Sequence, residues 1–303
     1  MKNDILQQIN LLKKEKNAVI LAHYYVSGEI QEIADYVGDS FYLAKIAKNI
    51  SADVIVFCGV YFMGESAKIL NPNKTVLMPD LTADCPMAHM VKEGKIEKMR
   101  EQYTDLAVVC YINSSAQLKC KSDVCVTSSN AVKIVKALPN KNVFFIPDEN
   151  LGRFVAEQVN DKNIILNDGY CPRHKEISLE QLKLIKSQHP TALVLTHPEC
   201  TKDVLDISDY IGSTAGIIDY AKNSLNDEFI ICTEEGVLHQ LQKNSPNKKF
   251  YFVQPRPVCE DMKKITLEKV LDVLITGKNA VEVSDEVRNL ALKPLEKMLE
   301  LAK

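Results

Sequence analysis

Three cysteines stand at matching places in the sequence, and their spacing is the feature best able to support chemistry. Cys85, Cys171 and Cys259 each follow an apolar run, and they are separated by 86 and 88 residues. Three thiolates without a fourth protein ligand suit a zinc ion that keeps one water, or a [4Fe–4S] cluster with one iron left open. An open iron can act as a Lewis acid on a substrate oxygen. A third interpretation is that all three are buried structural thiols.

The sequence holds nine cysteines and no CxxC pair. Zinc ribbons and ferredoxin-type clusters therefore lack their usual signature, and any metal site must collect its ligands from distant segments. We expect the other six cysteines to be packing or surface residues, three of them inside apolar strands and three on loops: Cys58, Cys110 and Cys232, and Cys120, Cys125 and Cys200.

Three further sets of landmarks share the register of the cysteines, each set separated by 88 and then 86 residues. A period of about 87 residues suits a small α/β domain, because solenoid repeats run about 20–50 residues. The sequence therefore predicts one α/β unit present three times. The first set ends the first strand of each unit and comprises His23, Tyr111 and His197. The second set begins a helix and comprises Ser40, Ser128 and Thr214. The third set lies in the second strand and comprises Cys58, Ile146 and Cys232.

We expect an α/β fold of three homologous three-layer domains with short parallel sheets, arranged with pseudo-threefold symmetry around a central active site. Each unit is predicted to hold three strands with intervening helices. The strands are continuous apolar runs, which is typical of parallel strands covered on both faces. The predicted units are 1–88, 89–174 and 175–262, followed by C-terminal helices in 263–303 that pack back on them. Helices are expected over 91–103, 178–188, 266–276 and 284–302.

The polar landmarks all follow strands, and ligands of parallel α/β sheets bind beyond the carboxyl ends of the strands. Three such rims related by a threefold axis converge on one cavity. Hydroxyl groups at helix starts there can bind an anion together with free backbone amides, although an ordinary N-cap is the simpler interpretation of any one of them. These residues are Ser40, Ser128, and Ser213 with Thr214.

Several side chains near these rims could transfer protons. His23 and His197 can donate to anions or carry protons, and Glu199 is a candidate general base. Tyr25 and Tyr111 could supply phenolic donors, with core packing as the alternative. His174, three residues after Cys171, is expected close to any metal.

Composition and charge narrow the class of protein. The formal net charge of the 303 residues is −3, so there is no overall electrostatic case for binding nucleic acid or an anionic membrane. The first 17 residues form a charged amphipathic stretch rather than a signal peptide, and no apolar run reaches about 18 residues. We therefore expect a cytoplasmic location.

Strings of residues along essentially the whole chain are similar to those of one enzyme family. Because of these strings and the three cysteines at their spacing, the chain resembles the quinolinate synthases. The strings are AHYY at 22–25, DYVGDS at 35–40, FCGVYFMGESAKIL at 57–70, MPDLTADCPMA at 78–88, VCYINSSAQLK at 109–119, VTSSNA at 126–131, DGYC at 168–171, HPEC at 197–200 and GSTAGI at 212–217.

The resemblance implies a fold, a reaction and a cofactor. Quinolinate synthases have three similar α/β domains and condense iminoaspartate with dihydroxyacetone phosphate, losing phosphate and two waters, in NAD biosynthesis. Their oxygen-sensitive [4Fe–4S] cluster, one per chain, has three cysteine ligands, which this resemblance assigns to Cys85, Cys171 and Cys259. The open iron would bind substrate and assist a dehydration. Because iminoaspartate is unstable, we expect a transient hand-off of this substrate from an aspartate-oxidising enzyme.

The resemblance also implies roles for the remaining site residues. Those that hold a substrate carboxylate or phosphate are His23, Ser40, Ser128, Ser213 and Thr214. Those that line the site are Tyr25, Tyr111, Asn113, His174, His197 and Glu199, with Tyr25 and Glu199 as the main proton-transfer groups and His197 and Tyr111 beside them.

Two positions depart from the family pattern, Val26 and Tyr170, and a C-terminal cysteine pair present in some members is absent. Three other kinds of protein remain as alternatives. Diphthamide-synthesis radical enzymes and the reductive dehydrase of isoprenoid synthesis share a three-lobed, three-cysteine layout, but neither explains the HPEC, GDS and GST strings together. A zinc-stabilised binding protein without chemistry would be colourless.

Overall fold

Three separate sheets organise the chain, one in each third of the sequence, and every pair of neighbouring strands is parallel. A computed structural model describes residues 2–303. All three sheets have the same strand order, with the second strand at one edge, then the first, third and fourth. The strands are β1 (Ala18–His23), β2 (Tyr36–Gly38), β3 (Val54–Cys58) and β4 (Thr75–Leu77); β5 (Leu106–Tyr111), β6 (Val124–Val126), β7 (Asn142–Ile146) and β8 (Asn163–Leu166); and β9 (Leu193–Thr196), β10 (Tyr210–Ile211), β11 (Glu228–Cys232) and β12 (Lys249–Phe252).

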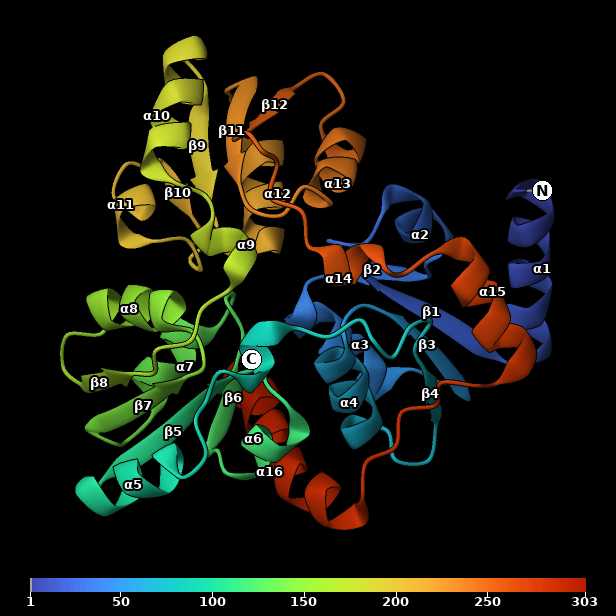
Figure 1. Cartoon of the computed structure of the whole chain (residues 1–303), viewed down its shortest axis with the longest axis horizontal. Coiled ribbons are helices and arrows are strands. Elements are labelled where there is room, and N and C mark those ends of the chain that lie inside the picture. The colour runs from blue at the N-terminus through green and yellow to red at the C-terminus, as the bar shows by residue number, and fades with distance from the viewer. Residues whose placement is uncertain (1) are drawn as a thin grey trace.

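Helices connect the strands and flank the sheets. Figure 1 shows the three sheets as three lobes, with α9 and α14 where the lobes meet. The helices are α1 (Lys2–Glu15), α2 (Gly28–Ile33), α3 (Ser40–Asn49), α4 (Tyr61–Leu70), η1 (Pro86–His89), α5 (Lys95–Gln102), α6 (Ala116–Cys120), α7 (Ala131–Ala137), α8 (Glu149–Gln158), α9 (Pro172–Lys175), α10 (Leu179–Gln188), α11 (Lys202–Leu205), α12 (Thr214–Asn223), α13 (Val237–Asn244), α14 (Glu260–Lys263), α15 (Leu267–Thr276) and α16 (Asp285–Leu301).

This architecture confirms the predicted α/β class and its three units. The prediction of three strands per unit was wrong by one, because β2, β6 and β10 contain only two or three residues and give no apolar run of their own. Cys125 lies in β6 and Cys120 ends α6, so the loop placement was wrong for both. Cys200 lies on a loop as predicted and is buried there. The sheets occupy 18–77, 106–166 and 193–252. The unit boundaries at 88, 174 and 262 remain predictions.

An aspartate at the start of each short edge strand repeats in all three units. Its backbone N–H donates to a carbonyl in the middle of the neighbouring strand, and its carboxylate accepts that residue's N–H at 2.7–2.8 Å. The aspartate thus satisfies both backbone groups of one residue and fixes the edge strand in register. The pairs are Asp35 with Ile20, Asp123 with Val108, and Asp209 with Val194.

A lysine near the start of each fourth strand repeats in the same way. Its ammonium group donates to two carbonyls in the last turn of the helix before the third strand or in the loop that follows that helix. These bonds tie the fourth strand to the amino end of the third. These residues are Lys74, Lys162 and Lys248.

The apolar core is continuous through the first two units and includes α15 and α16. Two smaller apolar clusters flank the third sheet. Helix α16 buries Ala291, Leu295 and Met298 completely and packs against α4, α6, α7 and β6, so it ties the first unit to the second. Helix α15 packs against α1 and β3.

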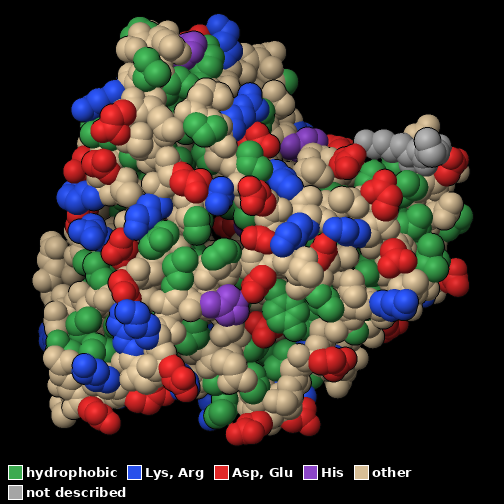
Figure 2. All heavy atoms as spheres, in the orientation of Figure 1, with side chains coloured by type: hydrophobic (Ala, Val, Ile, Leu, Met, Phe, Trp, Pro, Cys, Tyr) green, Lys and Arg blue, Asp and Glu red, His purple; other side chains and the backbone are tan. Residues whose placement is uncertain are grey.

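The surface mixes charges of both signs. Figure 2 shows basic and acidic side chains interspersed over the face drawn there, in keeping with a net charge of −3. Among residues 2–303, none of the helices combines the length and the apolar character that crossing a membrane requires.

Candidate functional site

A cavity of about 100 Å³ collects side chains from all three units. Thirteen of the fourteen site residues predicted from sequence line it, and they reach it from the carboxyl ends of the strands, as the topology rule predicts. Ser213 does not line the cavity, because its hydroxyl caps α12 by accepting the N–H of Gly216. The thirteen are His23, Tyr25, Ser40, Cys85, Tyr111, Asn113, Ser128, Cys171, His174, His197, Glu199, Thr214 and Cys259.

The three cysteines occupy the same structural position in their units. Cys85, Cys171 and Cys259 are the residues before η1, α9 and α14, respectively. In each case the backbone N–H groups of the turn that follows favour the ionised sulfur, two of them for Cys85 and Cys259 and one for Cys171. Burial raises the pKa of all three thiols, to about 11 for Cys259. A metal that binds them must displace these protons, and the N–H donors would then stabilise the thiolates.

One backbone hydrogen bond, present in every unit, sets the cysteine loops against the sheet. The N–H of a residue at the start of the helix after the third strand, or two residues before it in the third unit, donates to the carbonyl two positions before the cysteine, at 2.8–2.9 Å. Because this bond joins the same two places in each unit, the three thiols face the cavity alike. The bonds run from Tyr61 to Ala83, from Glu149 to Gly169, and from Glu235 to Pro257.

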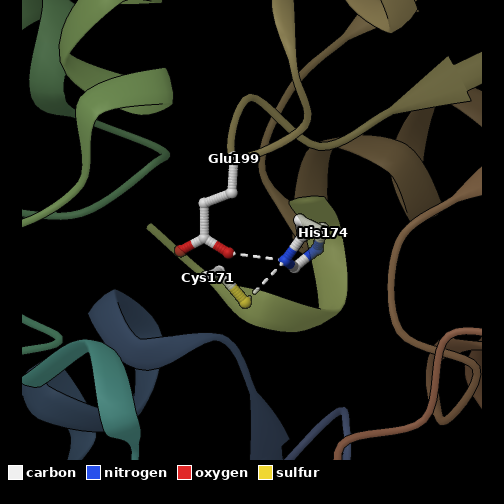
Figure 3. A group of neighbouring side chains, drawn as sticks. All are labelled: Cys171, His174 and Glu199. Carbon is white, nitrogen blue, oxygen red and sulfur yellow. Dashed lines mark hydrogen bonds and ion pairs between the residues drawn. The ribbon is translucent and has the colours of Figure 1, made fainter. Parts of the chain in front are cut away.

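The ligand atoms of Cys171, His174 and Glu199 lie within 4.8 Å of one another (Figure 3). His174 Nδ1 is 2.7 Å from Glu199 Oε2 and 3.1 Å from Cys171 Sγ. In the described part of the chain, the sulfur atoms of the three cysteines do not form a group this tight. They are nevertheless neighbours electrostatically, since Cys85 interacts with both Cys171 and Cys259.

Hydrogen bonds join Tyr25 to Glu199 across the cavity wall. The Tyr25 hydroxyl lies 2.7 Å from Thr233 Oγ1 and 2.9 Å from Thr214 Oγ1. Thr233 Oγ1 is also 2.8 Å from His174 Nε2, whose other ring nitrogen faces Glu199. The line from Tyr25 through Thr233 and His174 to Glu199 therefore uses residues of all three units.

Burial controls which of these groups are charged. It lowers the pKa of His23 and of His197 to about 3, so both imidazoles are neutral near pH 7. It raises the pKa of Tyr25 and of Tyr111 well above the usual value, and the negative charge of Glu199 adds to this, so both phenols keep their protons.

Burial also opposes ionisation of Glu199, yet the pKa of this carboxyl is held below its usual value by His174 and His197. Since His197 is neutral near pH 7, the stabilising partner there is His174, which lies 2.7 Å from one carboxylate oxygen. The site therefore places an ionised carboxylate beside neutral phenols, the pattern of a base paired with acids.

Two buried oxygens of the lining have no hydrogen-bond partner within residues 2–303: Glu199 Oε1 and Asn113 Oδ1. Unpaired buried acceptors are costly, so each fits a ligand that brings an N–H or O–H donor. Ser40 and Thr214 are the first residues of the ten-residue helices α3 and α12, whose free N–H groups favour anions. Ser128 lies in the turn before α7.

Sequence reasoning missed several residues of the site. Arg173 is the only lysine or arginine among the described residues that line the cavity, and its place between Cys171 and His174 was a usable signal. Asp39, which caps α3, and Glu234 also line it. Thr233 had no motif to mark it, since it is a single hydroxyl residue after an apolar strand.

The matching family model and the curated relatives of this chain agree with one another. The family model described as Quinolinate synthetase A protein matches residues 7–300. A quinolinate synthase of Fusobacterium nucleatum is 57% identical over 295 residues, covering 97% of this chain and 98% of that protein. The quinolinate synthase of Clostridioides difficile is 54% identical, covering 100% of this chain and 99% of that protein. That of Caldicellulosiruptor bescii is 52% identical, covering 99% of this chain and 98% of that protein. The chain belongs to the quinolinate synthase family of enzymes.

Proposed function

We propose that this enzyme condenses iminoaspartate with dihydroxyacetone phosphate to quinolinate, with loss of phosphate and two waters, in NAD biosynthesis. The observation that carries the proposal is the convergence of three cysteines, one from each unit, on a cavity that also holds an ionised carboxylate and two protonated phenols.

The donor set fits a [4Fe–4S] cluster held by Cys85, Cys171 and Cys259. Backbone N–H groups near each sulfur favour its thiolate form, which is the form that ligates a cluster. One zinc ion with Zn–S bonds of ~2.3 Å would hold its sulfur ligands within ~4.6 Å of one another. The sulfurs of the described chain are spread more widely than a 4.8 Å group, which favours the cluster over zinc. When bound, a cluster with one open iron supplies Lewis-acid assistance to the loss of a hydroxyl group.

The polar groups around the cysteines suit substrates that carry carboxylates and a phosphate. The starts of α3 and α12 offer N–H groups together with the hydroxyls of Ser40 and Thr214. The guanidinium of Arg173 adds a permanent positive charge to the lining. Neutral His23 and His197 can each accept one hydrogen bond and donate another, which orients a bound substrate without adding charge.

Proton transfer is assigned to the line of residues between Tyr25 and Glu199. The carboxylate of Glu199 accepts a proton from substrate at Oε1, which has no hydrogen-bond partner among the described residues, and the Tyr111 phenol lies close to this carboxylate. The phenol of Tyr25 donates a proton to a departing oxygen, and Thr233 and His174 link the two groups by hydrogen bonds.

An anaerobic experiment tests the proposal. Purified protein should be brown, contain about four irons per chain, and form quinolinate from iminoaspartate and dihydroxyacetone phosphate. Cys171→Ala should lose both iron and product formation. Cys120→Ala is the matched control, because this thiol bonds to the carbonyl of Val287 outside the cavity, and it should keep both. Full activity in Cys171→Ala, or a colourless zinc protein, would overturn the assignment.

A further inference from the structure

A carboxylate accepts the backbone N–H of each of the three cysteines. Asp84 Oδ1 is 2.8 Å from the nitrogen of Cys85, Asp148 Oδ2 is 3.1 Å from that of Cys171, and Glu234 Oε1 is 3.0 Å from that of Cys259. Asp84 is adjacent to its cysteine and 43% exposed, so water can take its place. The other two carboxylates come from distant segments and are buried, with 0% and 1% exposure.

Asp148 and Glu234 are equivalent positions of the repeat. They are 86 residues apart and each follows the third strand of its sheet, β7 or β11. The equivalent residue of the first unit is Val60, which cannot accept a hydrogen bond through its side chain. The second and third cysteine loops are therefore each held by a buried carboxylate. The first unit has the same fold without one, so the carboxylate is not needed to form the repeated unit.

Both oxygens of each carboxylate face donors. Asp148 Oδ1 accepts the N–H of Leu151 at 2.6 Å while Oδ2 serves Cys171. Glu234 Oε2 accepts the N–H of Gly236 at 2.6 Å, while Oε1 serves Cys259 and an ion pair with Lys263 at 2.8 Å. An amide of the same shape must turn its NH₂ group toward one of these donors. Only a carboxylate satisfies both sides of these sites.

We infer that Asp148 and Glu234 are positioning residues for Cys171 and Cys259. Each holds the peptide N–H of its cysteine and so fixes the direction in which the thiolate meets the metal. The inference rests on the proposed assignment of the cysteines as cluster ligands. Outer-shell groups of this kind orient metal ligands, and their loss typically costs 10–100-fold in metal affinity or activity.

The test compares Asp148→Asn and Glu234→Gln with the wild-type enzyme, all loaded anaerobically. Iron release to a chelator should be about 10–100-fold faster in both variants, and the electron paramagnetic resonance spectrum of the reduced cluster should change. In the metal-free proteins, alkylation followed by mass spectrometry should show Cys171 reacting several-fold faster only in Asp148→Asn, and Cys259 only in Glu234→Gln. Asp123→Asn is the matched control, because this carboxylate also accepts a backbone N–H but serves Val108.

A general loss of stability would not produce changes confined to one cysteine. The inference is overturned if both amide variants release iron and alkylate like wild type, or if both cysteines respond equally in each. If the amide variants do not fold, Asp148→Glu and Glu234→Asp decide, because each keeps a carboxylate but moves its oxygens by one methylene group. Cys171 alone should react faster in the first and Cys259 alone in the second, and unchanged alkylation in both overturns the inference. If wild type itself binds no iron, the proposed function fails, while the alkylation pattern still tests whether the carboxylates hold the cysteines.

Discussion

Thr233 links Tyr25, the proposed acid, to His174 and so to Glu199, the proposed base, although it does not line the cavity itself. Its hydroxyl is 2.7 Å from the Tyr25 hydroxyl and 2.8 Å from His174 Nε2. We predict that Thr233→Val, which keeps the shape and removes the hydroxyl, lowers kcat about 10²-fold, the lower range for loss of acid–base catalysis. Steady-state kinetics of the iron-loaded enzyme measures this, and iron content should stay at the wild-type level.

Thr196→Val is the matched control for that prediction. Thr196 is also fully buried, and its hydroxyl bonds to Ser208 at 2.6 Å outside the cavity. It should lower stability and leave kcat near wild type. Equal kcat losses in the two variants would mean that Thr233 has only a packing role.

The residues found from sequence share one property: each stands at a repeated position or in a polar string that closes a strand. The three cysteines and His23 were accessible in this way, and the cavity does contain them. Thr233 was not, because a single polar residue after an apolar strand is common in any α/β protein. Asp148 and Glu234 were not, because the repeat places a carboxylate there in only two of the three units, with Val60 in the first. Their significance appears only when distant backbone N–H groups and side chains are placed beside them.

The two buried neutral histidines predict how stability depends on pH. The pKa of His23 and of His197 falls to about 3 in the folded state, against about 6.5 in the unfolded chain. As pH drops below about 6.5 the unfolded chain binds protons that the folded protein does not, so stability is complete above that pH and declines toward pH 3. Each histidine contributes a loss of ~1.4 kcal/mol per pH unit.

Denaturant unfolding of the metal-free protein at pH 7 and pH 5.5 checks this prediction. His197→Gln should lose ~1 kcal/mol less than wild type between the two pH values, because one titrating group is gone. Identical losses in wild type and variant would show that His197 already carries a proton in the folded state.

At the scale of the elements, the edge strands depend on one carboxylate each. β10 has only two residues, and the carboxylate of Asp209 accepts the N–H of Val194 in β9 at 2.8 Å. We predict that Asp209→Ala lowers the free energy of unfolding by ~1–3 kcal/mol, since a buried strand N–H loses its acceptor. Asp209→Asn keeps an acceptor oxygen and should lose less than half as much. Equal losses in a denaturant titration would contradict this account.

The long strands and helices were predictable for physical reasons that the edge strands lack. Continuous apolar runs mark β1, β5 and β9, and the helices expected over 178–188 and 266–276 correspond to α10 and α15. The aspartates at 35, 123 and 209 are separated by the same 88 and 86 residues, and this spacing can be seen in the sequence. The spacing alone does not say what these aspartates do, and their role appears only from the paired bonds to the neighbouring strand.

At the scale of the whole molecule, the three units each contribute one wall of the cavity. The units differ in the polar side chains that they place there, and so in the roles that we assign to them. Glu199 and its HPEC string occur only in the third unit, and Tyr111 with Asn113 only in the second. The arrangement of three sheets around one site followed from the common register of the landmarks. The packing of α16 across α4 and α6 did not, because its apolar face fits any apolar groove of suitable length.

Gln31 joins the first unit to the third, directly behind Tyr25. Its buried amide nitrogen donates to the carbonyls of Tyr24 and Val26 at 2.8 and 3.0 Å and to that of Gly236 at 3.0 Å, and its oxygen accepts from Gln240. We predict that Gln31→Leu lowers the free energy of unfolding by ~2–3 kcal/mol, because buried carbonyls lose their donor. It should also lower kcat, since Tyr25 and the segment after Glu234 lose their common support. Gln240→Leu removes one of these hydrogen bonds and should cost less than half as much. A Gln31→Leu enzyme with wild-type kcat would show that the two units keep the site aligned without this amide.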